Sequence, residues 1–181
     1  MSGVKILLNT WRDTVNEPVR GEPPDMVYSD NITKQIITRM LNSGNNQVKQ
    51  LGKELDKLYK NKASSVRVKT RIYTLVKNIA DDGSPNNHTK LEISETKYKK
   101  LVSERKQGII SDLDNQLLEK ALFAKVCHCV KKRLSNETAK WLLGDIDKDL
   151  DNLPYNPYAV CTSSIYNKRG FTRDTSFSKC K

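Results

Sequence analysis

The four cysteines are the residues with the most distinctive chemistry in this sequence. Cys127 and Cys129 form a C-x-C pair. Cys161 and Cys180 follow singly, so all four cysteines lie in the last third of the chain. Four thiolates are the ligand set of a closed zinc site, although such sites usually hold two close cysteine pairs and this chain has one.

Disulfides are the second interpretation of the cysteines. Side chains two residues apart point in different directions on a helix, so the cysteines of the C-x-C pair would reach different partners, Cys161 and Cys180. Such bonds would tie the C-terminal tail back onto the domain. Buried free thiols, packed as small apolar groups, are the third interpretation. The even, clustered count favours a crosslink and a cytosolic compartment disfavours one, so the residues alone leave the three states open.

A second group of residues carries most of the chain's charge of +11. Residues 31–80 hold 11 basic and 2 acidic side chains, a net charge of +9. Lysine and arginine in this density neutralise phosphates or meet an acidic protein surface, although a solvated helix face is a common alternative. We expect the partner- or phosphate-binding residues to be Lys49, Lys53, Lys57, Lys60, Lys62, Arg67, Lys69 and Arg71.

Catalytic motifs are missing from the sequence. It has no glycine-rich phosphate loop, no paired-histidine metalloprotease motif and no nucleophile elbow. Leu150 and Asn156 occupy the positions where a calcium loop needs glycine and glutamate, so we interpret the preceding run of alternating aspartates as an acidic turn. That run consists of Asp145, Asp147, Asp149 and Asp151. We therefore predict a protein that is not an enzyme and has no cofactor, with zinc the exception if the cysteines are not disulfide-bonded.

Helices are the elements expected to position these residues. Residues 1–29 contain Pro18, Pro23 and Pro24 without a sustained apolar period, which predicts an extended arm. From residue 30 onward apolar residues recur at helical spacing. Asp30 is the expected cap of the first helix, the second places its lysines opposite its apolar residues, and a third begins at Ser64 or Ser65. Residues 81–93 are expected to be a loop, with an extended piece at its end.

The C-terminal half shows clear helix boundaries. Ser94 and Gly108 bound one expected helix, and Asp112 begins the longest one. Ser135 is expected to start a separate helix that ends at Gly144. The pair Asn156-Pro157 is typical of a further helix start.

The predicted fold class is therefore all-α, an irregular multi-helix domain with an extended N-terminal arm and a cysteine-linked C-terminal tail. Its predicted segments are the arm 1–29, a basic helical segment 30–80, the loop 81–93 and a helical cysteine-containing module 94–181. The sequence has no apolar run long enough for a transmembrane segment, and the apolar patch within its first nine residues is too short for a signal peptide. Its 36% hydrophobic content suits a modest core.

The cysteine-bearing blocks resemble a module in small proteins of large nucleocytoplasmic DNA viruses. The first block, residues 127–132, reads CHCVKK, the second, residues 158–170, reads YAVCTSSIYNKRG, and the last, residues 179–181, reads KCK. They are similar to a C-x-C-[VI]-K-K block, an A-[VI]-C-x-S-[VI] block and a basic cysteine-bearing end. The resemblance is confined to residues 127–181. Many such viruses carry their own thiol oxidase, so the resemblance favours disulfides.

The resemblance implies a structural virion component of the small, minor capsid type, assembled in the host cytoplasm. We expect a minor capsid or cement protein that bridges major capsid proteins, or the capsid and an inner membrane. Its expected partners are the major capsid protein and other minor capsid proteins. The alternative is a basic nucleic-acid-binding protein packaged with the viral genome, for which the lysines and arginines above would be the phosphate contacts. A zinc-dependent transcription accessory factor is a third hypothesis.

Overall fold

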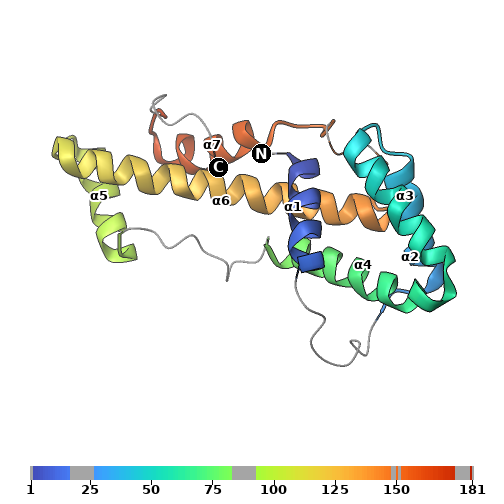
Figure 1. Ribbon diagram of the computed structural model, residues 1–181. Coiled ribbons are helices and arrows are strands. Elements are labelled where there is room, and N and C mark those ends of the chain that lie inside the picture. Colours follow the sequence, from blue (N-terminus) through green and yellow to red (C-terminus); the bar gives the residue numbers. More distant parts are fainter. Residues whose placement is uncertain are drawn as a thin grey trace. The chain divides into compact units, whose positions relative to one another are not determined.

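Helices make up all the regular structure that is described for this chain. A computed structural model describes residues 2–16, 27–82, 93–147, 150, 152–173 and 180. These ranges contain no strand, which agrees with the all-α prediction (Figure 1). The elements are α1 (Gly3–Asn16), α2 (Asp30–Leu41), α3 (Asn46–Lys60), α4 (Lys62–Asp82), α5 (Glu95–Gln107), α6 (Asp112–Leu143), α7 (Pro157–Ile165) and the short 3₁₀ helix η1 (Asn167–Arg169).

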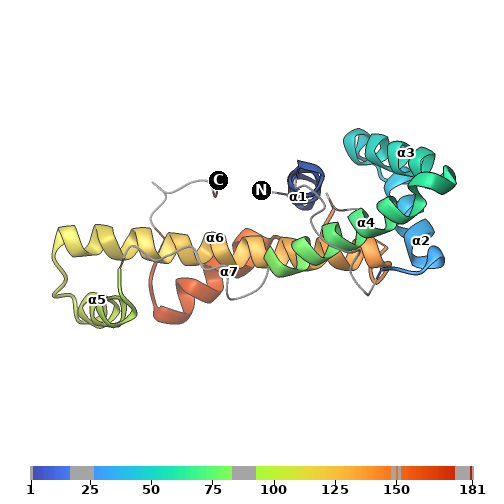
Figure 2. The same cartoon turned by 60° about the horizontal axis from the view of Figure 1, so that its bottom comes forward.

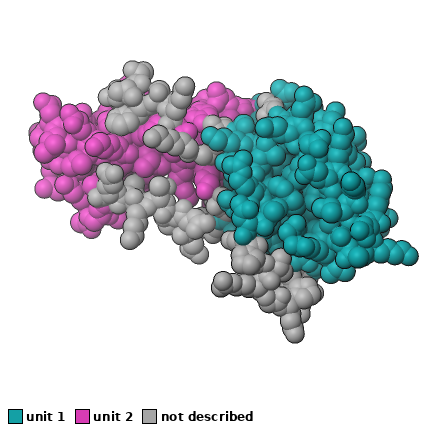
Figure 3. Space-filling model, in the orientation of Figure 1, with its two compact units in different colours: residues 1–84, 134–154 teal, residues 85–133, 155–181 magenta. Residues whose placement is uncertain are grey.

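The chain divides into two units, which Figure 3 distinguishes by colour. Unit 1 consists of residues 1–84 and 134–154, and unit 2 of residues 85–133 and 155–181. Helix α6 therefore contributes its first part to unit 2 and its last part to unit 1. The predicted module 94–181 is shared between the two units.

Unit 1 is built from α1 to α4 and the last part of α6. Helix α2 packs on α3, α3 packs on α4, and α1 contacts both α3 and α4 (Figures 1 and 2). The apolar residues predicted for these helices supply much of the core. Its fully buried members are Leu7, Ile36, Met40, Val48, Leu55, Ile72, Leu75, Ile79 and Leu142.

Side-chain caps determine where the helices of unit 1 begin. Ser29, rather than the predicted Asp30, caps α2, and its hydroxyl accepts from the Ile32 amide. Helix α4 begins at Lys62, where the Asn61 side chain accepts from the Ala63 amide, so the predicted start at Ser64 or Ser65 is wrong. Asparagine at a helix start satisfies amides that have no partner within the helix. Asn61 does this although it is the single residue between α3 and α4.

Helices α2 and α3 approach each other closely at Gly52. A Cβ atom at this position would lie 2.8 Å from the Leu41 amide nitrogen and 2.9 Å from the Met40 carbonyl carbon. Any larger residue would have to push the two helix backbones apart. Glycine is costly inside a helix, and this packing explains its presence here.

The extended N-terminal arm is the largest part of the prediction that the structure overturns. Residues 3–16 form α1, with Val4, Leu7 and Thr14 among its buried residues, so the extended arm is wrong for this stretch. The first proline, Pro18, lies beyond the last residue of the helix and does not interrupt it. Residues 17–26 lie outside the described part of the chain.

Unit 2 contains α5, the first part of α6, α7 and η1. Ser94 caps α5 and Gly108, at a φ of +72°, ends it, as predicted. The buried residues include Tyr98, Leu101, Leu118, Leu122, Val126, Val130, Cys161 and Tyr166. The extended piece that was predicted before α5 lies largely in residues 83–92, which are outside the described residues.

Helix α6 runs without a break past Ser135. The prediction of a separate helix starting there is wrong, because Ser135 is fully buried inside the helix and the apolar side continues through Leu134 and Leu142. Serine within a helix can resemble a cap in sequence, and here burial decides in favour of the helix interior. The predicted end at Gly144 is correct, with a φ of +91°. No helix among the described residues has the length and apolar character needed to span a membrane.

Candidate functional site

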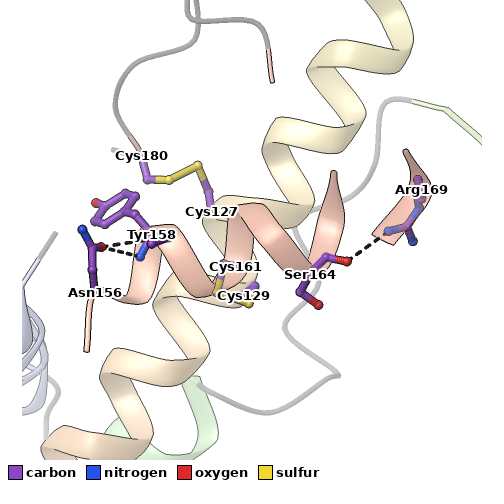
Figure 4. Close-up of a disulfide and its surroundings, with 9 residues drawn as sticks. Cys127, Cys129, Asn156, Tyr158, Cys161, Ser164, Arg169 and Cys180 are labelled. Atoms are coloured by element: carbon purple, nitrogen blue, oxygen red, sulfur yellow. Dashed lines mark hydrogen bonds between the residues drawn. A yellow bond between two sulfur atoms is a disulfide. The ribbon is translucent and has the colours of Figure 1, made fainter. Parts of the chain in front are cut away.

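The four cysteines form two pairs in unit 2. Cys127 and Cys180 have an S–S distance of 2.08 Å and a Cα–Cα distance of 5.3 Å. Cys129 and Cys161 have an S–S distance of 2.06 Å and a Cα–Cα distance of 5.8 Å. Both Cα–Cα distances lie in the usual range for a disulfide. Figure 4 shows one bond leading from α6 to the tail residue and the other leading from α6 to α7.

This arrangement matches one of the three interpretations of the cysteines. As expected for disulfides, the two members of the C-x-C pair reach different partners. No cysteine is free. The described residues contain no group of three or more potential metal ligands. The cysteines are thus placed as two crosslinks that fasten α7 and Cys180 to α6.

Local hydrogen bonds stabilise both ends of α7, the helix that carries Cys161. The Asn156 side chain caps the helix and accepts from the Tyr158 and Ala159 amides, as its sequence context predicts (Figure 4). At the other end, the Arg169 guanidinium donates to the Ser164 and Ile165 carbonyls. Both ends of this nine-residue helix are therefore satisfied by side chains, which compensates for its short length.

A buried polar network lies in the same unit. Glu119 on α6 is 3% exposed and forms an ion pair with Arg105 of α5. It also accepts a hydrogen bond of 2.9 Å from the hydroxyl of Tyr166, which is fully buried. Burial, followed by the hydrogen bond to Glu119, raises the pKa of Tyr166. The Arg105 guanidinium lies 4.6 Å from the centre of the Phe171 ring. The network connects α5, α6 and the chain after α7.

Sequence reasoning missed this network, although the sequence contains a signal for it. Glu119 lies between Leu118 and Leu122 on the apolar side of α6. A carboxylate in such a position is buried only if it is paired. Its partners come from residues distant in sequence, so spacing alone did not identify them.

Two cation–aromatic contacts add to the packing around the cysteines. The Lys125 ammonium lies 4.3 Å from the Tyr98 ring centre and 3.8 Å from a Glu95 carboxylate oxygen. The Arg173 guanidinium lies 5.3 Å from the Phe123 ring centre. Each contact joins α6 to a neighbouring segment of unit 2. Contacts of this kind contribute roughly 0.5–1 kcal/mol at exposed sites.

The predicted phosphate-binding residues divide between α3 and α4 of unit 1. Lys49, Lys53, Lys57 and Lys60 lie on α3, and Lys62, Arg67, Lys69 and Arg71 lie on α4. Two of the eight have carboxylate partners. Lys60 lies 2.6 Å from Asp56, and Lys69 lies 2.6 Å from Asp30. The other six form no ion pair with any described residue.

Asp30 is the centre of a small surface cluster. Its carboxylate accepts from Lys69 and from the Tyr59 hydroxyl, the latter at 2.5 Å. These two bonds lower the pKa of Asp30. Burial and the bond to Asp30 raise the pKa of Tyr59 to about 12. Lys69 therefore helps to hold α4 against α2 and is a poorer phosphate ligand than the lysines without an ion pair.

Arg71 is also less available than the sequence suggests. Its side chain is half-buried and its Nε atom has no hydrogen-bond partner. Burial, followed by repulsion from Arg67, lowers the pKa of Arg71. Arg67 itself is exposed.

The acidic turn after α6 interacts with a guanidinium of the same unit. Arg39 of α2 donates to the Ile146 carbonyl at 2.8 Å, to the Gly144 carbonyl at 3.2 Å and to the Asp147 carboxylate at 2.9 Å. Asp149 and Asp151 lie outside the described residues. The described part of the turn therefore closes the C-terminal end of α6 against α2.

Comparisons of the chain with protein-family models, with curated proteins and with solved structures found no match. The chemistry of the two clusters, the crosslinked cysteines and the basic residues of α3 and α4, is therefore the basis for a functional assignment.

Proposed function

We propose that the chain is a structural component of a virus particle, a minor capsid or cement protein that bridges other capsid proteins, or the capsid and an inner membrane. The observation that carries the proposal is the pair of disulfides between α6 and the C-terminal segment. Disulfides persist in oxidising surroundings, which include the surface of cells and virions, and are rare in proteins that remain in the cytosol. The resemblance of residues 127–181 to a virion-protein module supports the same assignment.

The construction of unit 2 suits a part that keeps one shape in an assembly. Small units rarely bury enough apolar surface to be stable alone and commonly rely on crosslinks. Here the crosslinks are accompanied by the Glu119 network and by caps at both ends of α7. A stapled unit of this kind would present the same surface to each neighbour in a shell.

Fractionation of purified virus particles tests the proposal. Particles would be opened, treated with nuclease and extracted with increasing salt and then detergent, and the protein detected in each fraction. We expect it to stay with the shell after the genome has been digested. Absence from particles would refute the proposal. Release together with the genome would instead favour the alternative, a nucleic-acid-binding protein packaged with it.

A further inference from the structure

A row of lysines follows one exposed side of α3. Lys49, Lys53 and Lys57 are spaced four residues apart, and Lys60 continues the row. The helical rise places neighbours at this spacing about 6 Å apart, and the whole row spans about 17 Å. The core of the unit lies on the opposite side of the helix, which buries Val48, Leu51, Gly52 and Leu55.

The charges in this row are available for a partner. Lys49, Lys53 and Lys57 form no ion pair with a described residue, and the last two are exposed. Lys60 pairs with Asp56, but its side chain is 74% exposed, and an exposed pair at this spacing is weak. The exposed Lys62 follows directly at the start of α4. The row therefore extends from α3 to the beginning of the next helix.

We propose that Lys49, Lys53, Lys57 and Lys60 bind the phosphate backbone of double-stranded nucleic acid. A row of positive charges along one side of a helix fits a partner whose own negative charges repeat along a line, and the phosphates of a duplex strand do so.

Helix α3, all of which is described, offers no free aromatic side chain on which a base could stack, and this favours a duplex over a single strand. Single-strand binding usually combines basic residues with aromatic side chains on which bases stack. Tyr59 is the aromatic residue of α3, and its hydroxyl is held by Asp30 of α2. Binding through this row would be independent of nucleotide sequence, because lysine contacts to phosphate carry no base information.

Only some of the eight basic residues predicted from the sequence belong to this lysine row. Lys69 is bound to Asp30, and Arg71 is half-buried, so neither belongs to the proposed face. The inference goes beyond the structural role proposed above, since it names the partner of one surface of unit 1. It does not depend on that role.

Binding of the full oxidised chain to a duplex DNA of arbitrary sequence tests the inference. Fluorescence anisotropy would be measured between about 50 and 200 mM salt, the range over which phosphate contacts weaken most visibly. Four neutralised phosphates predict a slope of log affinity against log salt of about −3.6, or roughly a 150-fold loss over this range. The triple variant Lys49→Gln/Lys53→Gln/Lys57→Gln should reduce the slope to about −0.9.

A charge-matched variant in unit 2 is the control. Lys99, Lys100 and Lys106 are exposed on α5, so Lys99→Gln/Lys100→Gln/Lys106→Gln removes the same charge from another surface. It should retain the slope of the unmodified protein. Circular dichroism of both variants checks that they are folded.

Four results would overturn the inference. The first two are no binding to duplex DNA at low salt and an equal loss of duplex affinity in the two triple variants. The other two are tighter binding to single-stranded than to duplex DNA, and competition by polyglutamate as strong as competition by duplex DNA, which would point to an acidic protein partner. None of them bears on whether the protein resides in the particle shell, so this inference and the proposed function can fail separately.

Discussion

Removal of the Cys129–Cys161 crosslink by the double substitution Cys129→Ala/Cys161→Ala is expected to lower the free energy of unfolding by about 3 kcal/mol. The bond joins residues 32 apart in sequence, and Cys127 and Cys180 are 53 apart. The chain-entropy relation gives about 3.7 kcal/mol for the shorter loop alone and about 4.2 kcal/mol for the longer one.

The two loops are nested, so their effects do not add fully. With the inner bond in place, the free path of the outer loop falls from 53 to 53 − 32, or 21 residues, and its closure is worth about 3.3 kcal/mol. Both bonds together then stabilise the fold by about 7 kcal/mol. A chain that keeps only the outer bond retains about 4.2 kcal/mol of this, so loss of the inner bond costs about 3 kcal/mol.

Urea denaturation followed by far-ultraviolet circular dichroism measures this loss. Tryptophan fluorescence reports on unit 1 separately, because Trp11 and Trp141 both lie in that unit. We expect the larger change in the circular dichroism transition, since the bond lies in unit 2. Reductant should destabilise the unmodified protein by more than the double substitution does. A loss below about 1 kcal/mol would refute the assignment of this crosslink as a main stabiliser of the unit.

Three further predictions concern other contacts. Gly52→Ala should lower the free energy of unfolding by about 1–3 kcal/mol in urea titrations, because the new Cβ would lie 2.9 Å from the Met40 carbonyl carbon. Alanine has the better helix propensity, so unchanged stability would contradict the close helix packing. Glu119→Ala should lower the free energy of unfolding by about 3–5 kcal/mol in the same assay, because it leaves the Arg105 side chain, 19% exposed, without its buried partner. Glu119→Gln keeps a hydrogen-bond acceptor and should lower the free energy of unfolding by less. Tyr59 should ionise at about pH 12 in an alkaline titration followed by phenolate absorbance, and the Tyr59→Phe variant should lack this step. Because folding raises the pKa of Tyr59, the stability that it contributes is complete below the ordinary tyrosine pKa and is lost as the pH rises through 12.

Local chemistry accounts for the parts of the fold that could be predicted. Gly108 and Gly144 adopt positive φ at helix ends, and Asn156 caps α7, because each of these roles depends mainly on the residue and its immediate neighbours. The lysine row of α3 was also predictable, since the apolar residues on the opposite side determine which way the lysines face.

Tertiary burial accounts for most of the errors. Thr14 on α1 looks polar in sequence but is buried, and Ser135 looks like a cap but lies inside α6. Both depend on which other segments pack against the helix. Glu119 was overlooked for the same reason, because Arg105 and Tyr166 become its partners only in the folded chain.

The candidate site was predictable in outline only. The C-x-C spacing left the state of the cysteines open and predicted only that, in a disulfide-bonded chain, the two members of the pair reach different partners. The sequence could not assign Cys161 to Cys129 and Cys180 to Cys127, because that choice depends on where α7 and the tail lie along α6. The basic residues were identified as a group, and the structure distinguished the free lysines from those held by Asp30 and Asp56.

The proposed function rests most heavily on the covalent attachment of the C-terminal segment to α6, and disulfide mapping of the full chain tests that attachment directly. Free thiols would be blocked by alkylation before digestion without reductant, and the linked peptides fragmented between Cys127 and Cys129 to assign each bond. The predicted result is no alkylated cysteine, with Cys127 bound to Cys180 and Cys129 bound to Cys161. Any alkylated cysteine, or the opposite pairing, would contradict the attachment.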